Sequence, residues 1–203
     1  MSDWTASPLT LEGAVVRLEP LTRAHVPALC EVGLDPELWR WTLSNVRTGE
    51  DMQRYVDDAL SARERGTAYP FVTIERASGR VVGSTRFCAI EPAHRRLEIG
   101  YTFVAPSHQR TAINTEAKYL MMRHAFEVLD VNRVEFKTDA LNAKSRAALL
   151  RIGAKEEGTL RGHAITDGGR IRDSVYYSVL ASEWPAVRAA LEAKLREPGI
   201  RPA

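Results

Sequence analysis

The chain has 203 residues, which exceeds the typical domain length of roughly 150 but suits one compact α/β unit. Hydrophobic residues make up 44% and charged residues 27%, the composition of a globular protein with a proper core. The 28 basic and 26 acidic residues leave a net charge of +2 and are interleaved, which argues against nucleic acid as a partner. No Pro/Gly/Ser-rich linker divides the sequence. We therefore predict one domain over residues 1–203, with its core at about 11–184.

The sequence shows none of the patterns typical of export, membrane insertion or metal binding. Residues 1–13 lack a basic segment followed by an apolar run, and no stretch approaches the roughly 20 apolar residues that span a bilayer. Cys30 and Cys88 are the only cysteines, and the five histidines are scattered without ligand spacing. We expect a cytoplasmic protein with no membrane partner, no disulfide framework and no metal.

The N-terminal part of the chain predicts one strand and then helices. Residues 15–19 alternate weakly and indicate a strand. Thr22 is placed to cap a helix, and Asp35, which precedes a proline, starts a short second turn. A Thr-x-x-Asp capping box then predicts a helix over residues 48–65.

The middle of the chain changes to a strand period. Residues 71–74, 81–90 and 97–104 predict three consecutive strands in an antiparallel meander, which Pro106 closes. Apolar residues at helical spacing then predict a helix over 114–129.

The C-terminal part predicts a strand, a helix, a hairpin and a last helix. The strand covers 134–138, and Asn142 caps the helix that follows it. Residues 157–165 and 171–180 flank a Thr-Asp-Gly-Gly turn, which indicates a hairpin, and the last helix covers about 183–196. Together the elements predict an α/β (α+β) fold, a mixed sheet with helices on its faces.

Residues 101–117 run from a strand through a polar loop into a helix. Backbone N–H groups at a helix start, with the positive end of the helix dipole, can bind a pyrophosphate. Arg110, Thr111, Asn114 and Thr115 add side-chain donors. An ordinary capped helix, with Asn114 or Thr115 as its N-cap, explains this segment alone equally well.

The order of several motifs is informative. Glu98-Ile99-Gly100-Tyr101 is followed by Gln109-Arg110-Thr111-Ala112-Ile113-Asn114 and then by Thr115-Glu116-Ala117. An N-x-x-S segment from Asn142 to Ser145, an Arg-Ile-Gly-Ala at 151–154 and a Glu-Trp at 183–184 come later. In this order and spacing the chain resembles the GNAT superfamily of N-acetyltransferases, in particular its RimJ/RimL-like branch, over roughly residues 11–184.

The resemblance implies a mostly antiparallel central sheet that splays at two parallel strands, with helices on both faces. It implies acetyl-CoA as cofactor and direct transfer of its acetyl group, in a ternary complex, to a primary amine on a protein N-terminus or a small molecule. A homodimer is possible. The cofactor-binding residues that it implies are Phe103, Val104, Gln109, Arg110, Thr111, Ala112, Ile113, Asn114, Thr115, Asn142 and Ser145.

The chain departs from the family pattern at one place. The family's loop has two glycines, at the positions of Ala112 and Asn114. Glycine serves where a backbone approaches a phosphate closely or takes a positive φ. Alanine adds only a methyl group, and asparagine tolerates the left-handed region, so we expect cofactor binding to survive. The alternative function is a non-catalytic acyl-CoA-binding or interaction module that has kept the fold.

The resemblance also indicates how transfer would proceed. A bulge near residues 101–104 would open a V beside the strand at 134–138, where a backbone N–H near Val104 polarises the thioester carbonyl. Glu98 is the first candidate for the base, although six residues separate it from Val104, about 20 Å at full extension. A surface salt bridge with Arg95, Arg96 or a neighbouring strand is the alternative role of Glu98.

Other candidate residues surround this proposed centre. Ser145, Tyr176 and Tyr177 are candidates to protonate the leaving thiolate, with a helix-surface hydroxyl and strand packing as the alternatives. Trp39 and Trp41 are candidates for the acceptor side, and core packing is the alternative for each.

Overall fold

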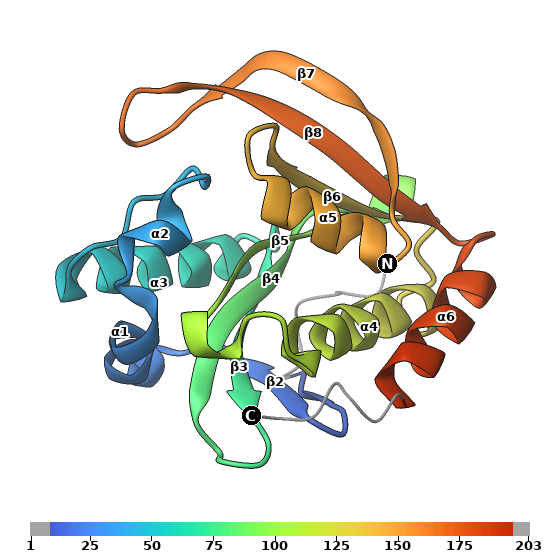
Figure 1. Ribbon diagram of the computed structural model, residues 1–203, viewed down its shortest axis with the longest axis horizontal. Helices are drawn as coiled ribbons and strands as arrows, with labels where there is room; N and C mark the ends of the chain where they lie inside the picture. The colour runs from blue at the N-terminus through green and yellow to red at the C-terminus, as the bar shows by residue number, and fades with distance from the viewer. Residues whose placement is uncertain (1–8, 197–203) are drawn as a thin grey trace.

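Eight strands form one mixed sheet in the order β1-β2-β3-β4-β5-β6-β8-β7 (Figure 1). The computed structural model describes residues 9–196. The strands are β1 (Leu11–Glu12), β2 (Val16–Pro20), β3 (Tyr69–Glu75), β4 (Val81–Glu91), β5 (Arg96–Val104), β6 (Arg133–Asp139), β7 (Lys155–Ile165) and β8 (Ile171–Leu180). The helices are α1 (Val26–Gly33), α2 (Pro36–Trp39), α3 (Gly49–Glu64), α4 (Ala112–Glu127), α5 (Ala143–Arg151) and α6 (Trp184–Arg196), with single 3₁₀ turns at Arg23–His25, Pro92–His94 and Pro106–His108.

Strands β5 and β6 form the parallel pair of this otherwise antiparallel sheet. Their pairing covers Arg96↔Arg133, Leu97↔Val134 and Glu98↔Glu135 and then stops. Beyond these pairs β5 continues beside β4, and β6 continues beside β8. The two strands therefore diverge after Glu98 and leave a V between them, as the resemblance implied.

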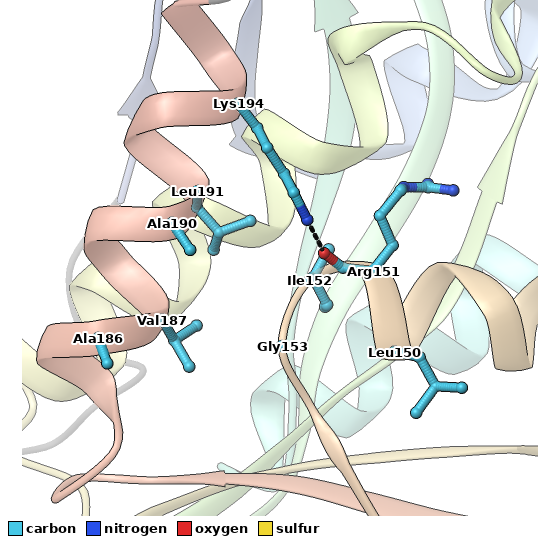
Figure 2. Close-up of a pocket in the computed structure, with 9 residues that line it drawn as sticks. All are labelled: Leu150, Arg151, Ile152, Gly153, Ala186, Val187, Ala190, Leu191 and Lys194. Carbon is cyan, nitrogen blue, oxygen red and sulfur yellow. Dashed lines mark hydrogen bonds between the residues drawn. The ribbon is translucent and has the colours of Figure 1, made fainter.

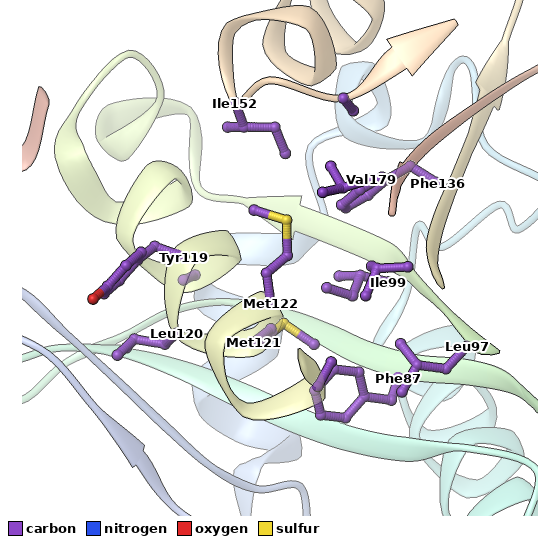
Figure 3. Close-up of a cluster of buried hydrophobic side chains, with 14 of the residues drawn as sticks. Phe87, Leu97, Ile99, Tyr119, Leu120, Met121, Met122, Phe136, Ile152 and Val179 are labelled. Carbon is purple, nitrogen blue, oxygen red and sulfur yellow. The ribbon is translucent and has the colours of Figure 1, made fainter. Parts of the chain in front are cut away.

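Two hydrophobic clusters cover the two faces of the sheet because side chains alternate along each strand. Phe71 belongs to the cluster under α4, α5 and α6, whereas its neighbour Val72 belongs to the cluster under α1, α2 and α3. Figure 3 shows Met121 and Met122 of α4 among side chains of the first cluster. Helices thus lie on both faces, which confirms the predicted fold class.

Helix α4 begins two residues earlier than predicted. Thr111 is its N-cap, in extended conformation, and its side chain accepts the N–H of Ile113. The first turn therefore contains Ala112, Ile113 and Asn114, which the sequence placed in the preceding loop. Asn114 and Thr115 were each reasonable caps by residue type, but the chain already enters the helix at Ala112.

Glu116 ties the start of the sheet to α4. Its carboxylate is 5% exposed and accepts the backbone N–H groups of Ala14 (2.8 Å), Val15 (2.7 Å) and Val16 (2.7 Å). A Cβ added to Gly13 would lie 2.4 Å from the carboxyl carbon. The glutamate that follows Thr115 is thus a structural anchor in this chain.

Strand β7 lies at the edge of the sheet and is exposed over almost its whole length. Register shifts interrupt its pairing with β8 between Glu156 and Gly158 and between Leu160 and Ala164. The tip of this hairpin reaches back to the loop after α2, where the N–H of Asp167 donates to Leu43 (3.0 Å).

Candidate active site

A β-bulge at Tyr101 shapes β5 where it leaves β6. The register of β5 against β4 shifts by one residue between the pairs Arg86↔Gly100 and Ser84↔Phe103. Tyr101 itself has φ +50°, in the left-handed region that a tyrosine seldom adopts. The bulge turns Tyr101 to the same face as Arg86, whose guanidinium lies 3.9 Å from the tyrosine ring centre.

A buried lysine supports the other side of this bulge. Lys118 of α4 donates to the hydroxyls of Thr102 (2.6 Å) and Thr85 (3.2 Å), and these hydroxyls lie 2.8 Å apart. Lys118 is 4% exposed, and burial lowers its pKa from 10.5 to about 7. The hydroxyl of Thr102 also lies 3.3 Å from the carbonyl oxygen of Gly100. This cluster holds the bulged segment against α4.

The backbone of Val104 faces the open side of β5. The N–H of Ala105 donates to the carbonyl of Val82 in β4, at 2.8 Å. Because successive N–H groups of a strand point to opposite edges, the Val104 N–H points away from β4 and toward the V. The side chain of Phe103, by contrast, is 5% exposed and packs on Trp39 and Tyr55, and its backbone pairs with Ser84 of β4, so Phe103 does not face the V.

The polar loop before α4 closes on itself. Gln109 donates to the carbonyl of Val104 (3.2 Å), and the Thr111 hydroxyl donates to that of His108 (2.8 Å). Ala112, Ile113 and Thr115 are buried, and the Ile113 N–H is already bonded to Thr111, so an anion here depends on the other backbone N–H groups of the first turn of α4. The Arg110 side chain is exposed and that of Asn114 is partly exposed, and within residues 9–196 the buried amide oxygen of Asn114 has no hydrogen-bond partner.

Ala112 and Asn114, which replace the two loop glycines of the family pattern, introduce no backbone strain. Residues with a positive φ that are not glycine include Arg110 (φ 64°), but neither Ala112 nor Asn114. Both lie in the right-handed first turn of α4. The expectation that asparagine replaces glycine by tolerating the left-handed region was wrong for Asn114, because Arg110 takes that conformation one residue before the N-cap.

Glu98 lies in a buried ion pair on the face that holds Arg86. Its carboxylate is 5% exposed and lies 3.1 Å from the ammonium of Lys137 on β6. Burial works to lower the pKa of Lys137, but the charge of Glu98 and its hydrogen bond raise it above its ordinary value. A Cβ on Gly100 would lie 2.7 Å from Oε1 of Glu98, so glycine leaves the space that the carboxylate fills.

The ion pair that the sequence suggested as an alternative role for Glu98 is therefore present, but it is buried and made with a neighbouring strand. Lys137 was not among the sequence candidates. The two residues are 39 positions apart and meet only because β5 and β6 pair in parallel register.

Helix α5 begins just after the end of β6 at which β5 and β6 have diverged, and it carries the N-x-x-S segment. Asn142 is its N-cap and accepts the N–H of Ser145 at 3.0 Å. Within residues 9–196 the Ser145 hydroxyl has no hydrogen-bond partner, which leaves it available for a ligand. Tyr177 is buried, and its hydroxyl bonds to Glu156 and Arg146, whereas Tyr176 lies on the other face, 5.7 Å from the Lys137 ammonium.

The two tryptophans have different surroundings. Trp39 is 5% exposed, and its indole N–H donates to the carbonyl of Gly33 (2.7 Å), so core packing describes its side chain. Trp41 is partly exposed and lies against the guanidinium groups of Arg40 and Arg170. Of the two, only Trp41 has a face that an acceptor can reach.

Two hollows lie at the surface. One, of about 280 Å³, separates the end of α5 from α6 and is lined mainly by apolar side chains such as Leu150 and Val187 (Figure 2). Lys194 spans it to the carbonyl of Arg151 (2.5 Å). No carboxylate, thiol or hydroxyl lines this hollow. The other, of about 330 Å³, adjoins the bulge and is lined by Tyr101 and Arg86.

Comparison with known proteins identifies the family. Residues 16–155 match the family described as the acetyltransferase (GNAT) domain. The chain belongs to this family. A GCN5-related N-acetyltransferase from Brucella melitensis superposes with a TM-score of 0.87 and 33% identity, over 96% of this chain and 88% of that one.

Two further relatives bear on the branch of this GNAT protein. RimJ of Mycobacterium smegmatis, solved in complex with CoA-disulfide, has a TM-score of 0.78 and 25% identity, over 96% of this chain and 97% of RimJ. YdaF of Bacillus subtilis (strain 168), provisionally named a ribosomal N-acetyltransferase, is 37% identical over 132 residues, 65% of this chain and 66% of YdaF. These similarities confirm the RimJ/RimL-like resemblance. The GNAT chain is an acyltransferase that uses acetyl-CoA.

No helix in residues 9–196 is long and apolar enough to cross a membrane. The same part of the chain contains no group of three or more His, Cys, Asp and Glu residues arranged to hold a metal ion.

Proposed function

We propose that this protein transfers the acetyl group of acetyl-CoA directly to a primary amine while both substrates are bound. The observation that carries this proposal is the divergence of β5 and β6 after Glu98, beside a bulge that directs the Val104 N–H into the opening. Glu98, the candidate base, and one side of the opening thus belong to the same strand, β5.

The residues at the opening fit the cofactor. The backbone N–H groups at the start of α4, together with Arg110 and Asn114, would hold the pyrophosphate. Asn142 and Ser145 would contact the pantetheine side, and the Val104 N–H would bind the thioester oxygen and stabilise the charge that it gains. When bound, acetyl-CoA supplies the activated acetyl group.

Glu98 would accept, through intervening water, the proton that the acceptor ammonium must lose before it attacks, because six residues of β5 separate Glu98 from Val104. Its carboxylate is held by Lys137 and fills the space beside Gly100. The Ser145 hydroxyl, which is free of other partners in residues 9–196, would return a proton to the leaving sulfur.

The cysteines support direct transfer rather than an acyl-cysteine route. Cys88 is the cysteine beside Glu98, with its sulfur 3.7 Å from the Glu98 carbonyl. Burial raises the pKa of the Cys88 thiol, and burial also raises that of Cys30. Because the thiolate is the nucleophile, both cysteines are poorly suited to carry an acetyl group.

Several broader features belong to the same proposal. We propose a single domain, supported by the one continuous sheet, and a cytoplasmic location, supported by the two unpaired cysteines. The acceptor is a small-molecule or peptide amine. A homodimer stays a prediction, which light scattering of the purified protein would test.

Steady-state kinetics with a panel of amines, following release of the CoA thiol, would test the mechanism. Glu98→Gln should lower kcat by about 100-fold or more and leave the Kd for acetyl-CoA nearly unchanged. Glu135→Gln is the matched control, because its carboxylate is already bound by Arg96 and Arg133. Acetyl-CoA binding without turnover of any amine would instead support the non-catalytic module.

A further inference from the structure

Arg86 carries a buried positive charge with which no carboxylate of residues 9–196 forms an ion pair. It lies on β4 and is 5% exposed. Its guanidinium is held between the rings of Tyr101 (3.9 Å) and Tyr55 (4.9 Å). In residues 9–196 no carboxylate pairs with this guanidinium, and its Nε is buried with no hydrogen-bond acceptor.

Other buried cations of this protein show why Arg86 is unusual. Within residues 9–196 Lys118 also forms no ion pair with a carboxylate, but a lysine can lose its proton when it is buried. Arg172, which is 5% exposed, has Asp139 at 3.9 Å. Arg86 cannot lose its proton, because a guanidinium keeps its charge at any pH a protein meets, and within residues 9–196 it has no carboxylate in ion-pair distance. Stacking on two tyrosines compensates the charge in part and leaves the edges of the guanidinium free to bind an anion.

The position of Arg86 relates it to the proposed base. Arg86 is opposite Gly100, and Cys88 is opposite Glu98, in the same stretch of the β4–β5 ladder. Arg86 and Glu98 therefore lie on one face of the sheet, two residues apart along the strands, or about 7 Å. Gly100, between them, contributes no side chain that would separate the two groups.

A hollow of about 330 Å³ leads to this position from the surface. Arg86 and Tyr101 lie beside Asp58 and Arg65 of the α3 segment in its wall, and Asp167 of the hairpin tip closes it. The volume is at the lower end of ordinary small-molecule sites, which suits a ligand of amino-acid size.

We propose that Arg86 binds a carboxylate carried by the acceptor, so that the acceptor is a small amine of the amino-acid type. This inference rests on the proposed acetyl transfer. A carboxylate on the free edge of the guanidinium would balance the buried charge of Arg86 and leave the amine on the face of β5 that carries Glu98. A protein N-terminus lacks the α-carboxylate of a free amino acid, because the α-carboxyl group of its first residue is in a peptide bond.

The test compares free amino acids with the methyl esters of the same amino acids. The amine of an ester is less basic than that of the free acid, so a larger fraction of it is neutral at a given pH. Without a carboxylate site, the ester should therefore react faster. We expect the wild type to prefer the acids by at least about tenfold in kcat/KM, and Arg86→Met to lose this preference. Arg86→Lys, which keeps the charge without the planar fork, should retain part of the preference.

Arg63→Met is the matched control, because Arg63 also stacks on a tyrosine, Tyr69 at 4.5 Å, but does not line the hollow. A second readout needs no turnover: N-acetyl amino acids should raise the Tm of the wild type and of Arg63→Met, and fail to raise that of Arg86→Met. Circular dichroism of each variant establishes that it is folded.

The outcomes separate the two proposals. Equal loss of rate on acids and esters in Arg86→Met, or a peptide amide that outperforms every free amino acid, would overturn the role of Arg86. Failure to acetylate any amine while acetyl-CoA binds would overturn the proposed function. In that case a rise in Tm with N-acetyl amino acids that requires Arg86 would still support a carboxylate site, and no such rise would overturn that site.

Discussion

Burial of Lys118 should make the stability of this protein depend on pH. In the folded chain burial lowers the pKa of Lys118 from 10.5 to about 7. Between about pH 7 and pH 10.5, Lys118 is therefore mostly protonated in the unfolded chain and mostly neutral in the folded chain. Because the unfolded state binds more protons there, the free energy of unfolding rises with pH from about 7 to about 10.5.

The size of the effect follows from the same two values. One proton contributes at most about 1.4 kcal/mol per pH unit. Between about pH 6.5 and about pH 8.5, the free energy of unfolding of the wild type should rise by ~2 kcal/mol more than that of a variant that has no lysine at this position. Lys118→Met is that variant, since methionine fills the space and the hydroxyls of Thr85 and Thr102 can still bond to each other.

Urea unfolding at these two pH values, for the wild type and Lys118→Met, measures the difference. Comparing the two proteins cancels the titration of every other group. Lys144→Met is the control, because Lys144 is exposed and its removal should leave the pH dependence of the wild type intact. If Lys118→Met and the wild type show the same change with pH, the lysine is not held neutral in the fold and the reasoning from burial fails.

Three further substitutions test other contacts. Glu116→Ala should lower the free energy of unfolding in urea by about 3 kcal/mol or more, since three buried N–H groups lose their acceptor; a loss under about 1 kcal/mol would contradict the anchor role. Gly100→Ala should reduce kcat at least tenfold, because the new methyl group displaces the Glu98 carboxylate, and an unchanged kcat would remove Glu98 from the reaction. Asn114→Glu should weaken acetyl-CoA binding about tenfold in isothermal titration by placing an anion at the start of α4, whereas equal affinity would exclude that helix end as the phosphate site.

The elements that sequence patterns located have partners close together in the chain. Thr48 and Asp51, three positions apart, form the capping box that starts α3, and both of its hydrogen bonds are present. Asn142 caps α5 through Ser145, and Gly153 has φ +89° just after this helix. Such contacts depend on a few consecutive residues, so residue type and spacing suffice to predict them.

The parts that sequence patterns missed depend on pairing between strands. Lys137 meets Glu98, and Arg86 meets Tyr101, only in the folded sheet. The resemblance indicated a bulge near residues 101–104, but nothing in a tyrosine marks it as the residue with positive φ. Lys118 follows the Thr-Glu-Ala motif at a position that helical periodicity shows to be buried, yet periodicity does not reveal which hydroxyls receive its hydrogen bonds.

The irregular pairing of β7 has a consequence for the behaviour of the protein at high concentration. A long, exposed edge strand is a template on which the strands of other molecules can add. The longest stretch of β7 that pairs regularly with β8 is only Gly158, Thr159 and Leu160, because a register shift lies on each side of it. A strand from another molecule would lose register after these residues. Although Leu160 and Ile165 are exposed, the bulged edge therefore disfavours growth of the sheet from one molecule to the next.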